Sequence, residues 1–185
     1  MDAAVIAALA KWPNVPAVFG WLRLDRRGNW LIREQQIRQP ALAAFINRNY
    51  ASDELGRHFF QNGPQRVFVD LDYAPWVVRL EAERLVTHTG EIVTADAGHI
   101  DDEGNMLFVW GKHAGLLDDR DLPAVLGGLQ QLDGSPAEES MILQAIEQAD
   151  TTLALGLGGR RLPVRPIRRD EVAGHFGFDP APTAD

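Results

Sequence analysis

Two stretches of the chain repeat one pattern, and this repeat limits the folds that the sequence can adopt. Leu24–Ile32 and Ile100–Phe108 both read apolar-Asp-x-x-Gly-Asn followed by three apolar residues, with an offset of 76 positions. Asp-x-x-Gly between apolar runs is typical of a β-hairpin turn. A proline that opens a predicted helix follows each copy, at Pro40 and at Pro123. The pattern predicts two related β-rich halves, although two ordinary hairpin turns remain an alternative.

Local patterns predict the remaining elements. Alternating or bulky apolar residues bounded by Gly, Pro and Asn predict strands. Those strands are Phe19–Leu24, Asn29–Arg33, Arg57–Gln61, Gln65–Leu71, Trp76–Leu80, Leu85–Thr89, Glu91–Thr94, Met106–Trp110 and Thr151–Leu157. Helical spacing predicts Ala3–Ala10, Ala41–Tyr50, a region within Asp118–Leu132, and a short helix within Asp170–Phe176. Arg160–Arg169 is expected to be extended.

One more helix is marked by its own start signal. Ser135-Pro136-Ala137-Glu138 has the form of a capping box, with serine at the N-cap, proline at N1 and glutamate at N3. Apolar residues then recur at helical spacing as far as Ile146. We therefore predict a well-capped helix near residues 136–150, with one face in the core.

These elements define an α+β protein. We expect a single compact domain over residues 1–185, with pseudo-repeat halves at about residues 18–90 and 91–170. Each half is expected to carry a hairpin and a short helix. Residues 178–185 (FDPAPTAD) are expected to form a disordered tail.

The net charge of −8 is distributed unevenly. Residues 91–150 contain 13 acids and two bases, whereas the flanking regions are close to neutral. Nucleic-acid binding requires bases that displace phosphate counterions, so we expect no nucleic-acid partner. The chain also lacks an apolar run of about 18 residues, and its acidic start differs from a secretory signal. We expect a cytoplasmic location and no membrane partner.

The usual catalytic and cofactor motifs are missing. The sequence has no cysteine, which excludes a disulfide, a zinc–thiolate site and a cysteine nucleophile. Gly156, Gly158 and Gly159 do not form a dinucleotide fingerprint, because the last glycine of the Gly-x-Gly-x-x-Gly pattern is missing. The sequence also contains no phosphate loop. The acidic turn at Asp101–Asn105 does not have the spacing of a calcium loop. We therefore assign no catalytic, cofactor-binding or metal-binding residue, and expect no cofactor.

Two sets of residues remain as candidates for binding. His88 and His99 flank a predicted hairpin and could meet across it, but we favour hydrogen-bonded strand histidines over a metal site. Arginines are dense near the C-terminus, where guanidinium groups can bind carboxylates or phosphates through paired hydrogen bonds. The candidate anion- or partner-binding residues are Arg160, Arg161, Arg165 and Arg168, with Arg169 beside them. The alternatives are salt bridges to the acidic block and protection of a sheet edge.

Several short motifs carry a family resemblance. These are Trp12-Pro13-x-Val15-Pro16, Gly28-Asn29-Trp30, Phe59–Val67 (FFQNGPQRV) and Ala74-Pro75-Trp76. On these motifs the chain resembles, over nearly its whole length, a family of uncharacterised proteobacterial proteins. It is more distantly similar, over about residues 20–130, to a second uncharacterised bacterial family. That resemblance implies a fold of repeated β-rich motifs and a conjectured role in signal transduction, but no catalytic residue.

The sequence thus favours a cytoplasmic binding or regulatory module without catalysis, acting on a small ligand or a protein partner. Two alternatives stay open. One is an enzyme of unrecognised type that uses scattered His, Asp and Glu residues. The other is a self-assembly or interaction protein, for example a homodimer in which the arginine segment docks on the acidic block of another copy.

Overall fold

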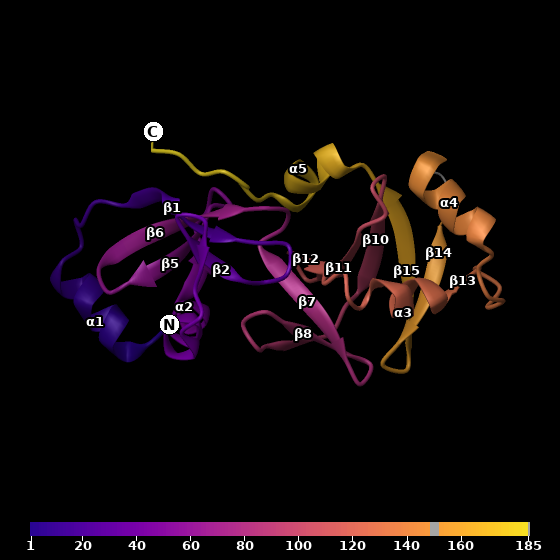
Figure 1. The fold of residues 1–185 in the computed structure, drawn as a ribbon, viewed down its shortest axis with the longest axis horizontal. Helices are drawn as coiled ribbons and strands as arrows, with labels where there is room; N and C mark the ends of the chain where they lie inside the picture. Colours follow the sequence, from indigo (N-terminus) through magenta and orange to yellow (C-terminus); the bar gives the residue numbers. More distant parts are fainter. Residues whose placement is uncertain (149–151, 185) are drawn as a thin grey trace. The chain divides into compact units, whose positions relative to one another are not determined.

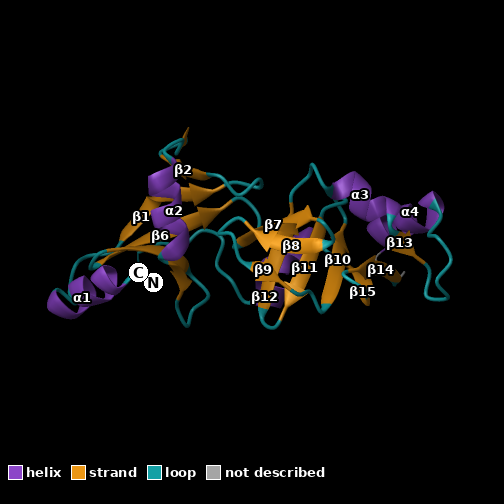
Figure 2. Ribbon diagram, turned by 90° about the horizontal axis from the view of Figure 1, so that it is seen from below, coloured by secondary structure: helices purple, strands orange, loops and turns teal. Residues whose placement is uncertain are grey.

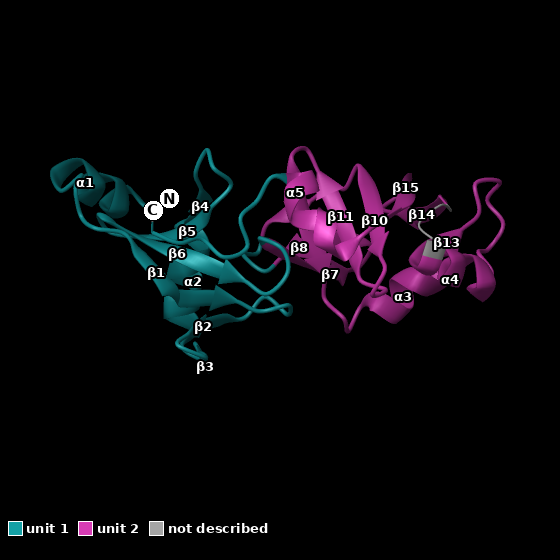
Figure 3. Ribbon diagram, turned by 90° about the horizontal axis from the view of Figure 1, so that it is seen from above, with its two compact units in different colours: residues 1–75, 88–90, 177–185 teal, residues 76–87, 91–176 magenta. Residues whose placement is uncertain are grey.

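A computed structural model describes residues 1–148 and 152–184. The chain forms two compact units, which are coloured separately in Figure 3. Unit 1 comprises residues 1–75, 88–90 and 177–185, and unit 2 comprises residues 76–87 and 91–176. No helix among the described residues has the length and hydropathy needed to cross a membrane.

Unit 1 is built on a six-stranded mixed sheet with the order β3-β2-β1-β6-β5-β4. Figure 1 labels four of these strands, β1, β2, β5 and β6. Its central pair, β1 and β6, is parallel, and the other neighbours are antiparallel. Helix α2 lies along one face of this sheet (Figure 2). The elements are α1 (Ala3–Lys11), β1 (Val18–Leu24), β2 (Trp30–Ile32), β3 (Gln35–Gln36), α2 (Pro40–Arg48), β4 (Tyr50–Ser52), β5 (His58–Asn62) and β6 (Gln65–Leu71).

Unit 2 is built on a nine-stranded mixed sheet with the order β13-β14-β15-β10-β11-β12-β7-β8-β9. Helices α3 and α4 both contribute side chains to its hydrophobic core. The elements are β7 (Trp76–Glu81), β8 (Arg84–Thr87), β9 (Ile92–Val93), β10 (Ala97–Asp101), β11 (Met106–Trp110), β12 (His113–Leu117), α3 (Leu122–Gly127), β13 (Leu129–Gln130), α4 (Glu139–Gln148), β14 (Leu153–Leu157), β15 (Arg160–Ile167), the 3₁₀ turn η1 (Arg169–Glu171) and α5 (Val172–Phe176).

Six strands of unit 2 repeat the connectivity of unit 1. The order β13-β14-β15-β10-β11-β12 matches β4-β5-β6-β1-β2-β3 strand for strand, and β10 and β15 form the parallel central pair. A proline-initiated helix follows the third strand of each repeated set, α2 after β3 in unit 1 and α3 after β12 in unit 2. Unit 2 adds the strands β7–β9 and the helix α4.

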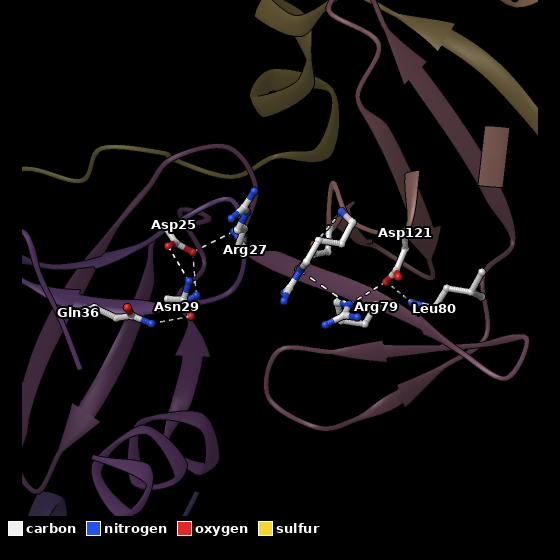
Figure 4. A network of polar contacts seen from close by, with 9 residues as sticks. Asp25, Arg27, Asn29, Gln36, Arg79, Leu80 and Asp121 are labelled. Carbon is white, nitrogen blue, oxygen red and sulfur yellow. Dashed lines mark hydrogen bonds and ion pairs between the residues drawn. The ribbon is translucent and has the colours of Figure 1, made fainter. Parts of the chain in front are cut away.

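The two predicted Asp-x-x-Gly-Asn hairpins form turns of the same construction. Asp25 accepts hydrogen bonds from the backbone N–H and the side-chain amide of Asn29, both at 2.8 Å (Figure 4). Asp101 accepts the same two bonds from Asn105, at 2.7 and 2.8 Å. Gly28 and Gly104 have φ angles of 78° and 80°, which glycine adopts without steric cost. Each aspartate thus fixes its hairpin by capturing the residue four positions later.

The predicted fold class is confirmed: the protein is α+β, with two β-rich halves. The helix predicted near residues 136–150 is also confirmed, but it begins at Glu139 rather than at Pro136. Ser135 does not cap it, because its N–H and its hydroxyl both donate to Asp133 Oδ1, at 2.9 and 2.7 Å. Pro136 forms a bridge with Gln130 instead. Residues 149–150 of the predicted helix and residue 151 of the predicted strand lie outside the described residues.

Two other segments differ from expectation. Within Asp118–Leu132 the helix is short and ends at Gly127, with Gly128 as its C-cap. Leu129 and Gln130 then form the strand β13, because they pair with β14. The segment that starts at Phe178, for which the sequence predicts disorder, packs on unit 1. Phe178 is buried, the Asp179 N–H donates to Gly56 O at 3.1 Å, and Pro180 O accepts from Leu71 N–H at 2.8 Å.

Candidate functional site

Unit 1 contains an apolar cavity of about 500 Å³. This volume lies within the range of small-ligand sites, about 300–1,000 Å³. The walls come from one face of the sheet and from α2, and they include two neutral amides. The lining residues are Val18, Trp21, Leu22, Ile32, Leu42, Phe45, Ile46, Phe60, Asn62, Gln65 and Val67. None of these lining residues is charged, so the walls favour an apolar body.

A bulge in β1 shapes one wall of this cavity. Val18 pairs with Val67 and Leu22 pairs with Val69, so three residues of β1 face the single residue Phe68 of β6. Gly20 allows the distortion, because it adopts a φ of +68°, and a Cβ added there would meet no atom within 4 Å. The bulge brings Trp21 and Leu22, which are neighbours in sequence, onto the same cavity wall. An undistorted strand would point them to opposite faces.

A cation lies beside the cavity wall. The guanidinium carbon of Arg33 is 3.7 Å from the ring centroid of Trp21, whose side chain remains 47% exposed. This is a cation–π contact, which holds the guanidinium without neutralising it. The neighbouring Glu34 pairs with Arg23 at 2.7 Å. No carboxylate among the described residues pairs with Arg33.

The corresponding place in unit 2 is largely filled. Phe60 pairs with Val67 in the β5–β6 hairpin, and Leu155 pairs with Leu162 at the same position of the β14–β15 hairpin. Phe60 therefore corresponds to Leu155, and Val67 corresponds to Leu162. In the 76-residue repeat, Ile32 corresponds to Phe108, which is 0% exposed. A smaller cavity of about 180 Å³ remains, partly covered by side chains of β8 and β9. Those strands have no counterpart among the described elements of unit 1.

The arginine segment is mostly engaged in contacts within unit 2. Arg160 donates to Ala95 O at 3.0 Å and lies 3.7 Å from Asp96, and Arg161 donates to Gln131 O at 2.6 Å. Arg168 pairs with Asp170 at 3.2 Å, and Arg169 pairs with Glu103 at 3.3 Å. Asp96 and Glu103 belong to the acidic block, as the salt-bridge alternative proposes.

The edge-protection alternative is wrong, because β15 lies between β14 and β10. Arg165 is the member of the cluster whose guanidinium has no described hydrogen-bond or ion-pair partner. Its strand neighbour across the parallel ladder is His99.

The two histidines considered for a metal site pack in different surroundings. His88 lies against Trp30 and Tyr50 in unit 1, with ring centroids 5.3 and 5.8 Å away. His99 lies against His175 and Phe176 in unit 2, at 5.8 and 5.5 Å. Burial, together with the nearby cations of His175 and Arg165, lowers the pKa of His99 to about 4. The described residues contain no group of three His, Asp or Glu side chains placed to hold a metal.

A cluster of ion pairs in unit 2 connects β7 to the segment before α3. Arg79 binds Asp121 at 2.7 Å, and the same carboxylate oxygen accepts the Leu80 N–H at 2.9 Å (Figure 4). Asp118, fully buried, pairs with Arg120, and this hydrogen bond holds the pKa of Asp118 at about 2. These contacts fasten the segment that precedes α3 to β7, and they leave the carboxylates fully engaged.

Sequence reasoning missed the cavity. It identified Phe19–Leu24 as a strand without a bulge. Trp30 is buried, and Trp76 and Trp110 are half-buried, but Trp21 is exposed beside the cavity. The available signal was Gly20 inside a strand pattern, which indicates a bulge or a close approach.

The fold defines a two-unit α+β protein, and unit 1 contains an apolar cavity of about 500 Å³. The model of the family DUF2944, described as "Protein of unknown function (DUF2946)", matches residues 1–183, and the chain belongs to this family. The comparison with curated proteins gives no match.

Two solved structures are similar, both of the DUF1285 family. The protein from Silicibacter pomeroyi DSS-3 has a TM-score of 0.54 at 17% identity, covering 93% of this chain and 98% of that one. The protein from Shewanella baltica OS155 has a TM-score of 0.38 at 12% identity, covering 54% and 85%. The first likeness extends the fold to a second family of unknown function.

Proposed function

We propose that this protein is a non-catalytic binding module that holds a small, largely apolar molecule in the cavity of unit 1. The observation that carries the proposal is the cavity itself: about 500 Å³, lined by apolar side chains and two amides. Burying apolar ligand surface contributes about 25 cal/mol per Å², so such walls supply affinity without charge. A regulatory role follows if occupancy changes how the module meets a partner.

Comparison of the units supports a binding role over a packing defect. Matching strand orders and turns favour a duplicated ancestral element, in which both units began with the same face of the sheet. In unit 2 that face carries the fully buried Phe108 in place of Ile32, and strands β8 and β9 cover it in part. Unit 1 keeps the apolar walls of this space open, although burying apolar surface would stabilise the fold by about 25 cal/mol per Å². Retention at that cost is expected where the space is used.

Titration with dodecanol, an uncharged molecule with a long apolar body, tests the proposal. We expect saturable chemical-shift changes at the indole N–H of Trp21 and at amides of β1, β6 and α2, together with a rise in Tm. A ligand at about 100 times its Kd stabilises the folded state by about 2.7 kcal/mol. The assignment of the Trp21 indole is made with Trp21→Phe. Unsaturable or scattered shift changes, with no rise in Tm, would contradict the proposal.

A second candidate is an anion site in unit 2 that includes Arg165. The observation favouring it is the unpartnered guanidinium beside His99 and His175. Because Arg160, Arg161 and Arg168 have partners already, they would contribute to this site only after rearrangement. Titration with inorganic phosphate should raise the pKa of His99 in the wild type but not in Arg165→Gln. An unchanged His99 titration at saturating phosphate would remove this candidate.

A further inference from the structure

We propose that the ligand of unit 1 is an amphipathic carboxylate, with its apolar body in the cavity and its carboxylate paired with Arg33. This inference rests on the proposed function, because it assumes that the cavity is a ligand site. It adds the chemical class of the ligand and the residue that selects it.

Charge complementarity carries the argument. The cavity lining is neutral, and the guanidinium of Arg33 lies 3.7 Å from the ring centroid of Trp21, a wall residue. Arg33 therefore contacts a residue that lines the cavity. A guanidinium prefers a planar, bidentate partner, and a carboxylate provides one. A ligand with an apolar body and a terminal carboxylate satisfies both the walls and the cation beside them.

The adjacent carboxylate is held elsewhere. Glu34 follows Arg33 directly but pairs with Arg23 at 2.7 Å. Arg23 alternates along β1 with Leu22, which lines the cavity, so Arg23 belongs to the opposite face of the sheet. Its pairing with Glu34 removes the nearest competitor for Arg33. The Gln65 amide donates to Pro16 O at 3.1 Å, so it too is engaged.

The backbone at Arg33 provides an independent observation. Arg33 and Glu34 connect β2 to β3 with φ angles of 45° and 68°, a conformation that favours Asn and Gly. The Arg33 N–H donates to Trp21 O at 3.1 Å, which ties the turn to the bulged strand. An arginine here is less favourable for folding than asparagine. The arginine places a guanidinium beside Trp21, which an asparagine in this turn would not do.

The turn also supplies a matched pair of variants. Arg33→Asn suits the positive φ and removes the cation. Glu34→Asn suits the neighbouring positive φ and keeps it. Each variant relieves a positive φ and gives up one exposed contact, of Arg33 with Trp21 or of Glu34 with Arg23, so both should fold about as stably as the wild type. Binding of dodecanoate and of dodecanol is then measured by calorimetry at pH 7.5, with dodecanoate below the concentration at which it forms micelles.

We expect the wild type to bind dodecanoate about tenfold more tightly than dodecanol, because a charge-assisted hydrogen bond to Arg33 contributes an affinity gain of this order. Arg33→Asn should bring this ratio to about one, whereas Glu34→Asn should leave it unchanged. Equal affinities for the two probes in the wild type would overturn the carboxylate inference and leave the proposed function intact. If neither probe binds, the proposed function fails. A preference for dodecanoate that survives Arg33→Asn would assign the carboxylate to another residue and overturn the role of Arg33.

Discussion

The two units share a strand order but differ in how completely side chains fill the space beside the equivalent face of the sheet. Unit 1 leaves about 500 Å³ open between its sheet and α2. Unit 2 leaves about 180 Å³ at the corresponding hairpin and uses two additional strands to cover it. In the repeat, the exposed Ile32 of unit 1 stands where unit 2 has the buried Phe108. The same strand order therefore accommodates a more open apolar space in unit 1 and a more filled one in unit 2.

The largest expected effect comes from moving a cavity residue of unit 1 into unit 2. Leu22 corresponds in the repeat to Gly98, where an added Cβ would lie 2.5 Å from Met106 Cε and 3.2 Å from Val164 Cγ2. We therefore expect Gly98→Leu to lower the free energy of unfolding by about 3 kcal/mol through overpacking. Urea unfolding measures the loss. If the variant is too unstable to purify, Gly98→Ala gives a smaller effect of the same sign.

A matched control lies in the same sheet. Gly156, on β14, has no atom within 4 Å of an added Cβ. Gly156→Leu should change the free energy of unfolding by no more than about 0.5 kcal/mol. Equal losses for the two glycines would mean that unit 2 is not packed more tightly at Gly98 than elsewhere, and would break the comparison.

The paired turns allow a second, smaller test. Asp101 and Asp25 each accept three hydrogen bonds within their own turns. Asp101 is only 1% exposed. Removing its carboxylate leaves buried donors without partners, so Asp101→Ala should cost about 2–3 kcal/mol. Asp25 is half-buried, so water can replace its bonds and Asp25→Ala should cost about 1 kcal/mol. Thermal unfolding of both variants checks the ranking, which equal costs would contradict.

Elements governed by local chemistry were predictable from the sequence. Asp-x-x-Gly-Asn determines both hairpins because the aspartate and the residue four positions later bond within a single turn. Pro40 and Pro123 lie in the first turns of α2 and α3, as predicted. The predicted start of α4 was wrong, and the cause is also a local hydrogen bond. The Ser135 hydroxyl donates to Asp133, two residues earlier, and is therefore not available to cap the helix.

The candidate site could not be predicted, because it depends on distant pairings. The bulge depends on the register of β1 with β6, whose paired residues lie 47 to 49 positions apart in the chain. The contact of Arg33 with Trp21 requires both that bulge and the tight turn after β2. The arginine segment shows the converse limit. Its composition indicated a binding site, but the acidic partners of Arg160 and Arg169 lie on β-strand connections more than 60 residues away.

Acidification should separate the two units with a modest effect. In unit 2 the folded-state pKa of His99 lies near 4, below the usual value of 6.5, chiefly because of burial. A depressed histidine pKa favours the neutral ring, so this stabilisation is present above pH 6.5 and is lost as the pH falls toward 4. The ring is partly exposed, so we expect about 1–2 kcal/mol after allowing for solvent screening.

Two partly buried carboxyls of unit 1 should respond in the opposite direction. Burial raises the pKa values of Asp70 and Asp72, so protonation there favours the folded state as the pH falls through the range of these carboxyls. Hydrogen exchange at pH 7.5 and at pH 4.5, after correction for intrinsic rates, reports each unit separately. Protection should fall in β10 and β15 relative to β1 and β6, and His99→Gln should reduce the difference. A uniform change in both units would contradict this assignment.

The smallest expected change in stability is also the sharpest test of the comparison. Ile32→Phe installs in unit 1 the residue that unit 2 carries at the corresponding position, where Phe108 is fully buried. Because Ile32 lines the cavity, the larger ring should enter open space and raise the free energy of unfolding by about 1 kcal/mol, as cavity-filling changes commonly do. The same ring should weaken dodecanol binding at least tenfold.

Leu55→Phe is the control, since Leu55 is an exposed leucine of unit 1 that lies outside the cavity lining. It should change neither the unfolding free energy nor the affinity for dodecanol by a measurable amount. Opposite signs for stability and binding in Ile32→Phe are the distinctive expectation, because a variant that merely damages the fold lowers both. If Ile32→Phe instead lowers stability and leaves binding intact, the ring does not enter the cavity. In that case Ile32 and Phe108 hold different places in their units, and the open space of unit 1 cannot be explained as the counterpart of a filled one.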